Sequence, residues 1–339
     1  MKIEKAYIEI TNICNLNCKT CYNRSGLNKE RHEISVKQLE KAILLLSKYG
    51  AKRFLISGGE PTLHSEFKKI TDLIRKYKNF SFGIVTNGTT GNNNLIELIN
   101  SVPNCTVQIS LDGCSEEDNK LTRGCGSFQK TIDFAKKIEH NFGKTNFIKM
   151  VISKDNYKNV EAFYNLTLLL GFTPEFAFIY RSGNATQAWE HKCLTAKEKI
   201  QILSLINKLN IQTGTDAFLP KCTTSCPFLS KDNKLGICIK PDGSIQPCQS
   251  LYDAKYTLSN IFEFNEEEFS NNLEKIYNLA NARILADFGC QKCILNKVCG
   301  RGCMAEAENL NSNPLSNDGN CEYRKLQFLL FDLKIHNAT

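Results

Sequence analysis

Three cysteines lie close together near the start of the chain, directly after an apolar, strand-like run. They are Cys14, Cys18 and Cys21, in the spacing C-x3-C-x2-C. Three thiolates can each bind one iron of a [4Fe–4S] cube, and the fourth iron then has no protein ligand. A structural zinc site is the alternative. Zinc in that role takes four ligands, usually from two C-x2-C pairs, whereas this loop has one such pair and the nearest histidine is His32.

The cysteine loop resembles the signature of the radical S-adenosylmethionine (SAM) superfamily. That resemblance implies that Cys14, Cys18 and Cys21 hold a [4Fe–4S] cluster whose open iron binds SAM. It also implies an oxidoreductase chemistry, in which an electron from the cluster cleaves SAM to methionine and a 5′-deoxyadenosyl radical. The radical then takes a hydrogen atom from an unactivated C–H bond of the substrate.

Alternating strands and helices follow the loop and must position it. Strands are expected at residues 6–10, 54–57, 80–86, 105–111, 145–152 and 175–180. Helices are expected between Ser35 and Gly50, with Gln38 completing a capping box, and at 65–77, 94–101, 127–140 and 158–170. Six β/α units imply a parallel sheet with right-handed crossovers, and they fit a partial (β/α)6 TIM-type barrel. A doubly wound sheet has the same periodicity and stays open as an alternative.

Glycines and polar residues follow the ends of these strands, where parallel sheets build their active sites. Gly58, Gly59 and Glu60 match the radical SAM motif that holds the methionyl amino group, and a glycine pair lets the backbone approach a ligand closely. Arg123 is expected in a polar loop, where it could bind the SAM carboxylate or be a solvated surface arginine. The SAM contacts implied by the family, beyond the glycine motif, are Thr86, Asn87, Ser110, Asp112 and Arg123.

A second set of cysteines begins after residues 182–194, which are expected to be a linker, and after a helix with Thr195 as its N-cap. These cysteines resemble the SPASM extension of radical SAM enzymes, which implies two auxiliary [4Fe–4S] clusters and three clusters in all. Two zinc sites are the alternative. By family pattern, the first auxiliary cluster is held by Cys222, Cys226, Cys248 and Cys303, and the second by Cys290, Cys293, Cys299 and Cys321.

Cys238 departs from the SPASM pattern. It lies within a run that predicts a β-hairpin with its turn at Asp242-Gly243. The family usually leaves about nine to fifteen residues between its upstream cysteine and this glycine. Neither Cys226 nor Cys238 satisfies that spacing, so the spacing does not decide between them. Cys238 is therefore a possible substitute for Cys226 as a ligand of the first auxiliary cluster.

The whole chain is therefore expected to have four parts. These are a radical SAM partial barrel over 1–185, a linker and bridging helix over 186–220, a SPASM auxiliary-cluster domain over 221–325, and a C-terminal helix or tail over 326–339.

Length and composition narrow the class of protein. The chain has 339 residues and 16 cysteines, with no apolar run long enough to cross a membrane and no secretion signal at its start. We therefore expect a cytoplasmic protein whose cysteines bind metal rather than form disulfides. The formal charge of +8 does not indicate nucleic acid, because thiolates on three clusters would lower it to about +3.

The resemblance covers residues 6–325 and is nearest to radical SAM/SPASM maturases of ribosomally made peptides (RiPPs), and more distant to anaerobic sulfatase-maturating enzymes. The latter carry an aspartate where Gln249 stands here, which disfavours sulfatase maturation. We expect oxidative modification of a peptide, by a thioether or another cross-link, with the auxiliary clusters accepting the electron.

The same resemblance suggests partners and leaves alternatives open. A flavodoxin- or ferredoxin-type reductant is implied. Because the cysteine loop begins at residue 14, no leader-recognition domain is expected before it, and a separate protein could serve instead. The alternatives are a peptide epimerase that uses a spare cysteine as hydrogen donor, small-molecule or tetrapyrrole oxidation, and a non-catalytic Fe–S electron carrier.

Overall fold

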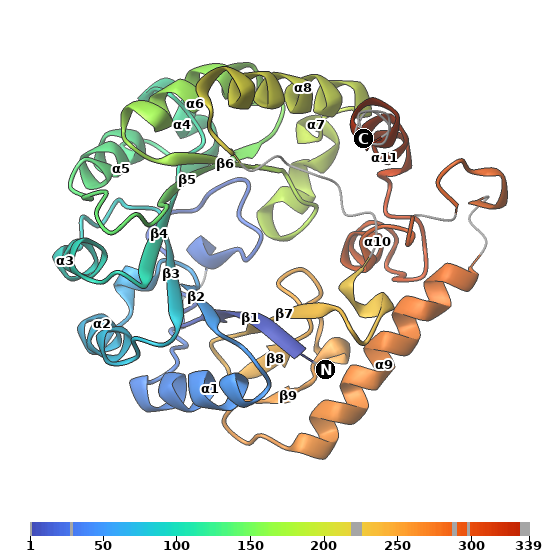
Figure 1. The fold of residues 1–339 in the computed structure, drawn as a ribbon, viewed down its shortest axis with the longest axis horizontal. Coiled ribbons are helices and arrows are strands. Elements are labelled where there is room, and N and C mark those ends of the chain that lie inside the picture. Colours follow the sequence, from blue (N-terminus) through green and yellow to red (C-terminus); the bar gives the residue numbers. More distant parts are fainter. Residues whose placement is uncertain (1, 28–29, 218–225, 287–289, 297–298, 333–339) are drawn as a thin grey trace.

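Six parallel strands form the wall of a partial barrel in the computed structural model, which describes residues 2–27, 30–217, 226–286, 290–296 and 299–332. The strands are β1 Lys2–Glu9, β2 Arg53–Ser57, β3 Ser81–Thr86, β4 Cys105–Ser110, β5 Phe147–Ile152 and β6 Thr173–Phe178. They lie side by side in chain order. A doubly wound sheet reverses its order at a switch point, so the observed order confirms the (β/α)6 barrel (Figure 1).

Helices cover the outer face of this sheet, as Figure 1 shows. They are α1 Val36–Lys48, α2 Phe67–Lys76, α3 Asn93–Ser101, α5 Ser127–Ala135 and α6 Val160–Leu169. The expected capping box of α1 is present between Ser35 and Gln38. Alternate strand residues such as Ile8, Phe54 and Ile148 are fully buried in one core with the apolar faces of these helices. This packing fixes the register of each strand, and with it the residues that emerge at the strand ends.

One helix of the barrel was not predicted. Helix α4, Glu116–Arg123, begins after Ser115, whose side chain accepts a hydrogen bond from the Asp118 N–H. Its sequence, EEDNKLTR, contains a single apolar residue. Periodicity therefore gives no signal for it, and the segment was wrongly expected to be a polar loop. The three acidic residues in its first turn favour a helix start, and this was the signal available.

The segment after β6 is helical rather than an irregular linker. It forms the short turns η4 Gly183–Ala188 and α7 Trp189–Lys192, followed by the long helix α8 Ala196–Thr213. The predicted capping box of α8 is present between Thr195 and Glu198.

Three further strands extend the barrel sheet beyond β1. They are β7 Lys234–Ile239, β8 Ser244–Gln246 and β9 Ser259–Asn260. Strand β7 is parallel to β1 and forms the predicted hairpin with β8, with Gly243 at a positive φ of 84° in the turn. The nine strands form one sheet, so the expected barrel and auxiliary-cluster regions share a hydrogen-bonded boundary. The four-part division of the chain stays a prediction.

The remaining described elements follow the hairpin or lie in loops. The helices are α9 Glu266–Leu285, α10 Met304–Asn311, α11 Cys321–Gln327 and the π-helical turn η8 Phe328–Asp332. The other short helical turns are η1 Ser25–Leu27, η2 Pro61–Leu63, η3 Tyr157–Asn159, η5 Pro227–Leu229, η6 Ala254–Tyr256 and η7 Cys290–Lys292. Across the described residues, no helix has the length and apolarity needed to span a membrane.

Candidate active site and cysteine groups

The cysteine loop is held in place by the loop that follows β2. The Gly59 N–H donates to the Thr11 carbonyl at 2.8 Å, and the Glu60 N–H donates to the Ile13 carbonyl at 2.8 Å. A Cβ atom on Gly58 would lie 2.3 Å from the Thr11 oxygen, and one on Gly59 would lie 2.1 Å from the Ile13 oxygen. The glycine pair is therefore needed for backbone packing against the cysteine loop, a contact that the sequence motif alone does not reveal.

Glu60 joins the ends of β2 and β3. Its buried carboxylate accepts hydrogen bonds from Thr62 Oγ1 at 2.6 Å, Thr86 Oγ1 at 2.7 Å and the Asn87 N–H at 2.8 Å. Burial raises the pKa of Glu60, and these hydrogen bonds oppose the increase. The side chains of Glu60 and Thr86, both predicted to contact SAM, thus bond to each other and set the shape of the strand ends.

Asn87 brings β3 to the first cysteine. Its Nδ2 atom donates to Asn15 Oδ1 at 3.0 Å and lies 3.9 Å from Cys14 Sγ, while the Leu16 N–H donates to the same sulfur at 3.4 Å. Burial raises the pKa of the free Cys14 thiol to about 12. Two N–H donors at the sulfur suit a thiolate that is bound to iron, because hydrogen bonds to cluster sulfurs stabilise the negative charge.

Arg123 lies near Cys18, and the alternative of a solvated surface arginine was wrong. Its side chain is 10% exposed and its Nε is 2.9 Å from Oδ2 of the fully buried Asp112. Burial raises the pKa of Cys18 to about 11, and the Arg123 charge opposes this increase. The Lys19 N–H also donates to the Thr122 carbonyl at 2.8 Å, so the end of α4 contacts the loop directly.

Asp112 is the centre of a buried network at the end of β4. Its carboxylate accepts a hydrogen bond from the Val151 N–H at 2.9 Å and one from Thr122 Oγ1 at 3.1 Å. These bonds orient Asp112, which in turn holds Arg123 towards the cysteine loop. The other predicted residue of this strand, Ser110, is half-buried at its C-terminal end.

The segment after β6 also binds the cysteine loop, which sequence reasoning missed. Asn184 donates from its backbone to the Cys21 carbonyl at 2.8 Å and from its side chain to the Cys18 carbonyl at 2.8 Å. A Cβ atom on Gly183 would lie 2.3 Å from the Cys21 oxygen. Ser-Gly-Asn directly after a strand is the same kind of signal as the turns after the earlier strands, and it was available in the sequence.

Glu9 connects the loop to the C-terminal hairpin. It accepts hydrogen bonds from Tyr22 Oη at 3.2 Å, Asn23 Nδ2 at 2.8 Å and Lys240 Nζ at 2.8 Å. The buried Cys238 thiol donates to the same carboxylate at 3.7 Å. Whether Cys226 or Cys238 serves as the auxiliary ligand stays a prediction.

Three cysteines of the first predicted auxiliary group lie close together. Burial is the main cause that raises the pKa of Cys303, and the charges of Glu306, Cys248 and Cys226 raise it further. The Leu251 N–H donates to Cys248 Sγ at 3.3 Å. Tyr180 Oη, just beyond the end of β6, lies 3.9 Å from Cys303 Sγ. The fourth predicted member, Cys222, falls outside the described residues.

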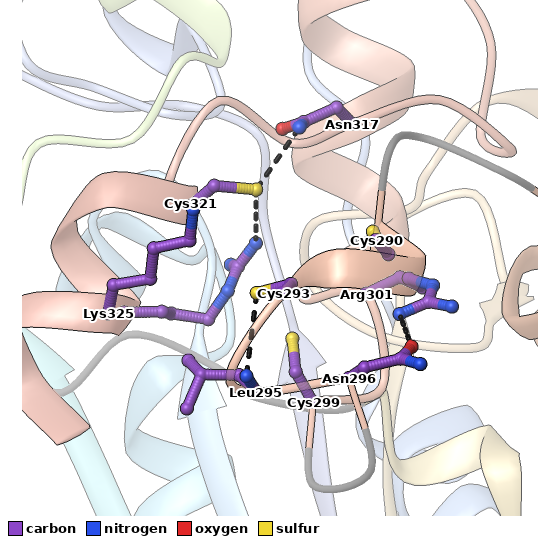
Figure 2. A pocket seen from close by; sticks show the side chains of 10 residues that line it. Cys290, Cys293, Leu295, Asn296, Cys299, Arg301, Asn317, Cys321 and Lys325 are labelled. Carbon is purple, nitrogen blue, oxygen red and sulfur yellow. Dashed lines mark hydrogen bonds between the residues drawn. The ribbon is translucent and has the colours of Figure 1, made fainter.

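All four cysteines of the second predicted auxiliary group line one pocket. Figure 2 shows Cys290, Cys293, Cys299 and Cys321 around it. Two of the sulfurs accept hydrogen bonds: Cys293 from the Leu295 N–H at 3.4 Å, and Cys321 from Asn317 Nδ2 at 3.1 Å. The basic side chains Arg301, Arg324 and Lys325 also line the pocket. Positive charge and N–H donors together suit a group of thiolates.

The arrangement of the described side chains also bears on whether a single metal ion could bind. Within the described ranges, no three histidine, cysteine, aspartate or glutamate side chains converge closely enough to hold one metal ion. A zinc ion needs its ligands around a single point, whereas an iron–sulfur cube carries one thiolate on each iron and holds the sulfurs farther apart. The thiolate donor set, with its N–H donors and basic neighbours, is compatible with iron–sulfur clusters, and the metal group held by the auxiliary cysteines stays a prediction.

Comparison with known proteins identifies the first half of the chain. Residues 8–167 match the sequence profile of the Radical SAM superfamily. This part of the chain is a radical SAM domain. The radical SAM family implies a [4Fe–4S] cluster and SAM, and the domain contains Cys14, Cys18, Cys21 and the Gly58-Gly59-Glu60 motif.

The relatives of the radical SAM protein include peptide maturases. The chain is 27% identical over 306 residues to mycofactocin maturase MftC of Mycolicibacterium smegmatis. The aligned region covers 88% of this chain and 77% of that protein. It is 25% identical over 333 residues to the antilisterial bacteriocin subtilosin biosynthesis protein AlbA of Bacillus subtilis, with 94% and 71% covered. Streptococcus suis SuiB bound to its precursor peptide SuiA has the same fold, with a TM-score of 0.76, 18% identity, and 94% and 75% covered.

These matches confirm the predicted resemblance to radical SAM/SPASM maturases and the predicted fold class. They also confirm the prediction of an enzyme, because the named relatives are peptide maturases. The roles of individual residues in the radical SAM site, and the number of auxiliary clusters, stay predictions.

Proposed function

We propose that this radical SAM enzyme oxidatively modifies a peptide and forms a thioether or another cross-link in it. The observation that carries the proposal is the position of the first auxiliary cysteine group. Tyr180, just beyond the end of β6, reaches within 3.9 Å of Cys303 Sγ, so this group lies beside the edge of the barrel where the cysteine loop is bound. The maturase relatives MftC and AlbA support the peptide as substrate class.

Three [4Fe–4S] clusters and SAM would be held by residues described above. Cys14, Cys18 and Cys21 would hold the SAM cluster. When bound, SAM and this cluster supply a 5′-deoxyadenosyl radical, and the auxiliary clusters supply an acceptor for the electron that an oxidised substrate must lose. The auxiliary ligands would be Cys222, Cys226, Cys248 and Cys303 for the first cluster, and Cys290, Cys293, Cys299 and Cys321 for the second.

The chain itself binds and orients these groups. The backbone contacts of Gly58 and Gly59 fix the cysteine loop. Arg123 would bind the SAM carboxylate with the guanidinium nitrogens not used by Asp112, because a guanidinium can pair with two carboxylates. Asn87 would donate towards Cys14 and Ser110 would contact the ribose. A reductant of the flavodoxin or ferredoxin type would supply the electron, and a separate protein could present the peptide leader.

The test is anaerobic incubation of the reconstituted enzyme with SAM, dithionite and a candidate precursor peptide, followed by mass spectrometry. We expect a product lighter than the peptide by about two hydrogens, and a matched C18A variant that forms neither this product nor 5′-deoxyadenosine. A product of unchanged mass that takes up deuterium from solvent would contradict the proposal and indicate epimerisation. Turnover of a small molecule without any peptide would also contradict it.

A further inference from the structure

A cavity of about 330 Å³ lies outside both cysteine groups, between the barrel and the C-terminal region. Its walls come from the turn after β6, from α7, from the start of α8, from α10 and from the segment that leads into α11. The volume falls in the range of ligand sites in proteins. No part of the cluster or SAM binding described above uses this space.

Part of the lining of the cavity is apolar. It is formed by Trp189, Leu194, Leu310 and Tyr323, of which Leu194 and Tyr323 are almost fully buried. Trp189 is half-buried and is the only tryptophan of the chain. Aromatic and aliphatic surface of this kind suits a large apolar side chain.

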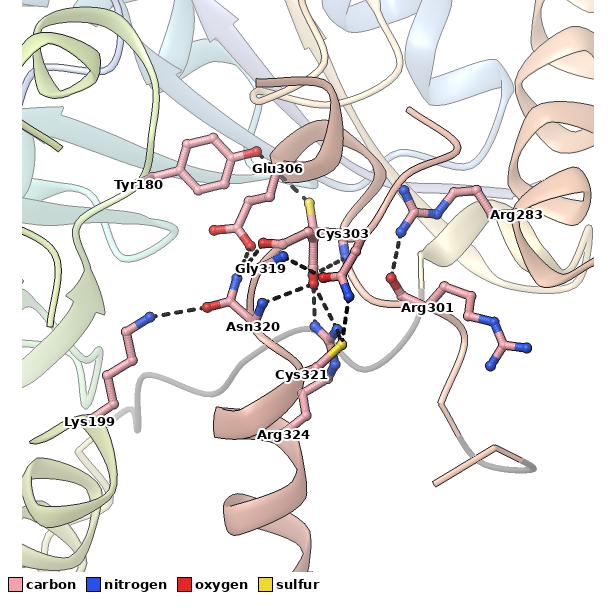
Figure 3. A network of polar contacts seen from close by, with 12 residues as sticks. Tyr180, Lys199, Arg283, Arg301, Cys303, Glu306, Gly319, Asn320, Cys321 and Arg324 are labelled. Carbon is pink, nitrogen blue, oxygen red and sulfur yellow. Dashed lines mark hydrogen bonds and ion pairs between the residues drawn. The ribbon is translucent and has the colours of Figure 1, made fainter. Parts of the chain in front are cut away.

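Most charged groups that line the cavity already have partners within the protein. Lys199 Nζ donates to Asn320 Oδ1 at 3.1 Å, and Asn320 Nδ2 donates to Glu306 Oε2 at 2.6 Å. Figure 3 shows these residues. Asp318 is buried and accepts two hydrogen bonds from the Arg324 guanidinium, each of 2.7 Å. The Arg324 guanidinium offsets the negative charge of Asp318. Glu322, at the rim, is exposed.

Arg181 is the exception. Within the part of the chain that the structure describes, it forms no ion pair, and its buried Nε atom has no hydrogen-bond partner. Arg181 as a whole is partly exposed, but a buried N–H group without an acceptor is costly. Its natural partner is a carboxylate, which it can bind through two parallel hydrogen bonds. The cavity therefore combines an unmatched cation with an apolar wall.

We propose that this cavity, which we call the Arg181 pocket, binds a carboxylate of the peptide substrate next to a large apolar side chain. The inference rests on the proposed function for its choice of a peptide ligand. Arg181 would pair with the carboxylate, and the apolar side chain would pack against Trp189 and Tyr323. Because Tyr180 precedes Arg181 and contacts Cys303, a peptide bound here lies at the boundary between the barrel and the first auxiliary group.

The test uses Trp189 fluorescence of the reconstituted holoenzyme, with saturating SAM and no reductant, so that no turnover occurs. Three probes are titrated: acetyl-Leu-Glu-Leu-amide, acetyl-Leu-Gln-Leu-amide, and acetyl-Leu-Gln-Leu with a free C-terminal carboxylate. Fluorescence anisotropy of labelled versions gives a second readout. We expect at least one carboxylate probe to bind at least about tenfold more tightly than the neutral probe, and the two carboxylate probes tell a side-chain source from a chain end.

R181Q should abolish this preference, R181K should retain part of it, and R53Q, which removes an exposed arginine at the start of β2, should leave it unchanged. Equal binding of all three probes, no binding, or a preference that survives in R181Q would overturn the pocket assignment. Normal cross-linking of a precursor by R181Q would overturn it as well. If the preference depends on Arg181 but no peptide is ever modified, the proposed function fails and the pocket stands.

Discussion

Replacing Asp112 by asparagine should show how strongly the site depends on its buried ion pair. Asp112 is fully buried, and its carboxylate is 2.9 Å from Arg123 Nε. It also accepts hydrogen bonds from the Val151 N–H and Thr122 Oγ1. Removing one partner of a buried pair usually costs about 3–5 kcal/mol, because the other charge is left uncompensated. Asparagine keeps one acceptor oxygen, so we expect D112N to lower the free energy of unfolding by about 3 kcal/mol.

The assay is anaerobic urea unfolding of the reconstituted protein, compared at equal denaturant slope. The matched control is E97Q, because Glu97 also pairs with an arginine, Arg75, but its side chain is 73% exposed. Exposed pairs contribute little, so E97Q should be almost indistinguishable from the unaltered protein. A D112N variant that loses less than about 1 kcal/mol would refute the view that Asp112 holds Arg123 in place.

Three further predictions concern the loop and its neighbours. G59A should lower the iron content after reconstitution, because its Cβ would lie 2.1 Å from a backbone oxygen of the cysteine loop. The control G91A strains its own positive φ of 59°, but its Cβ meets nothing within 4 Å, so it should leave the iron content unchanged. Burial tends to raise the pKa of Glu33, but hydrogen bonds to its carboxylate lower that pKa below 4.5 overall. E33Q should therefore lower the free energy of unfolding, measured with urea at pH 7, by about 1 kcal/mol. The difference from the unaltered protein should vanish as the pH falls through the lowered pKa. Y180F removes a hydroxyl 3.9 Å from Cys303 Sγ, and redox titration followed by electron paramagnetic resonance should show a lower potential for one auxiliary cluster, with unchanged production of 5′-deoxyadenosine.

The local parts of the fold could be predicted because their signals are local. The capping boxes at Ser35 and Thr195, the turn at Gly243 and the succession of strands and helices each depend on residues a few positions apart. Helix α4 has no apolar stripe, so periodicity could not reveal it. The burial of Arg123 was missed for the same reason. Arg123 ends α4, and its ion pair with Asp112 forms only when that helix packs against the end of β4.

The candidate site shows the same division. The cysteines and the glycine motif were recognised by type and spacing, but the reason for the glycines was not. Gly58 and Gly59 contact the backbone of the loop that carries Cys14, a contact between segments more than forty residues apart in the sequence. Glu9 and Lys240, which share a hydrogen bond, are still farther apart in the sequence. Neither contact leaves a pattern in one sequence, because each depends on how strands are ordered in the sheet.

The pairing of β1 with β7 has a consequence for synthesis of the chain. Strand β1 begins at Lys2, and its parallel partner begins at Lys234. At about 5–20 residues per second, the ribosome needs roughly 10 to 50 seconds to make the intervening segment. During that time one edge of the first strand has no partner, and such edges are sites of aggregation. The charged residues Lys2, Glu4 and Lys5 at the start of β1 would protect the nascent chain until the hairpin is made.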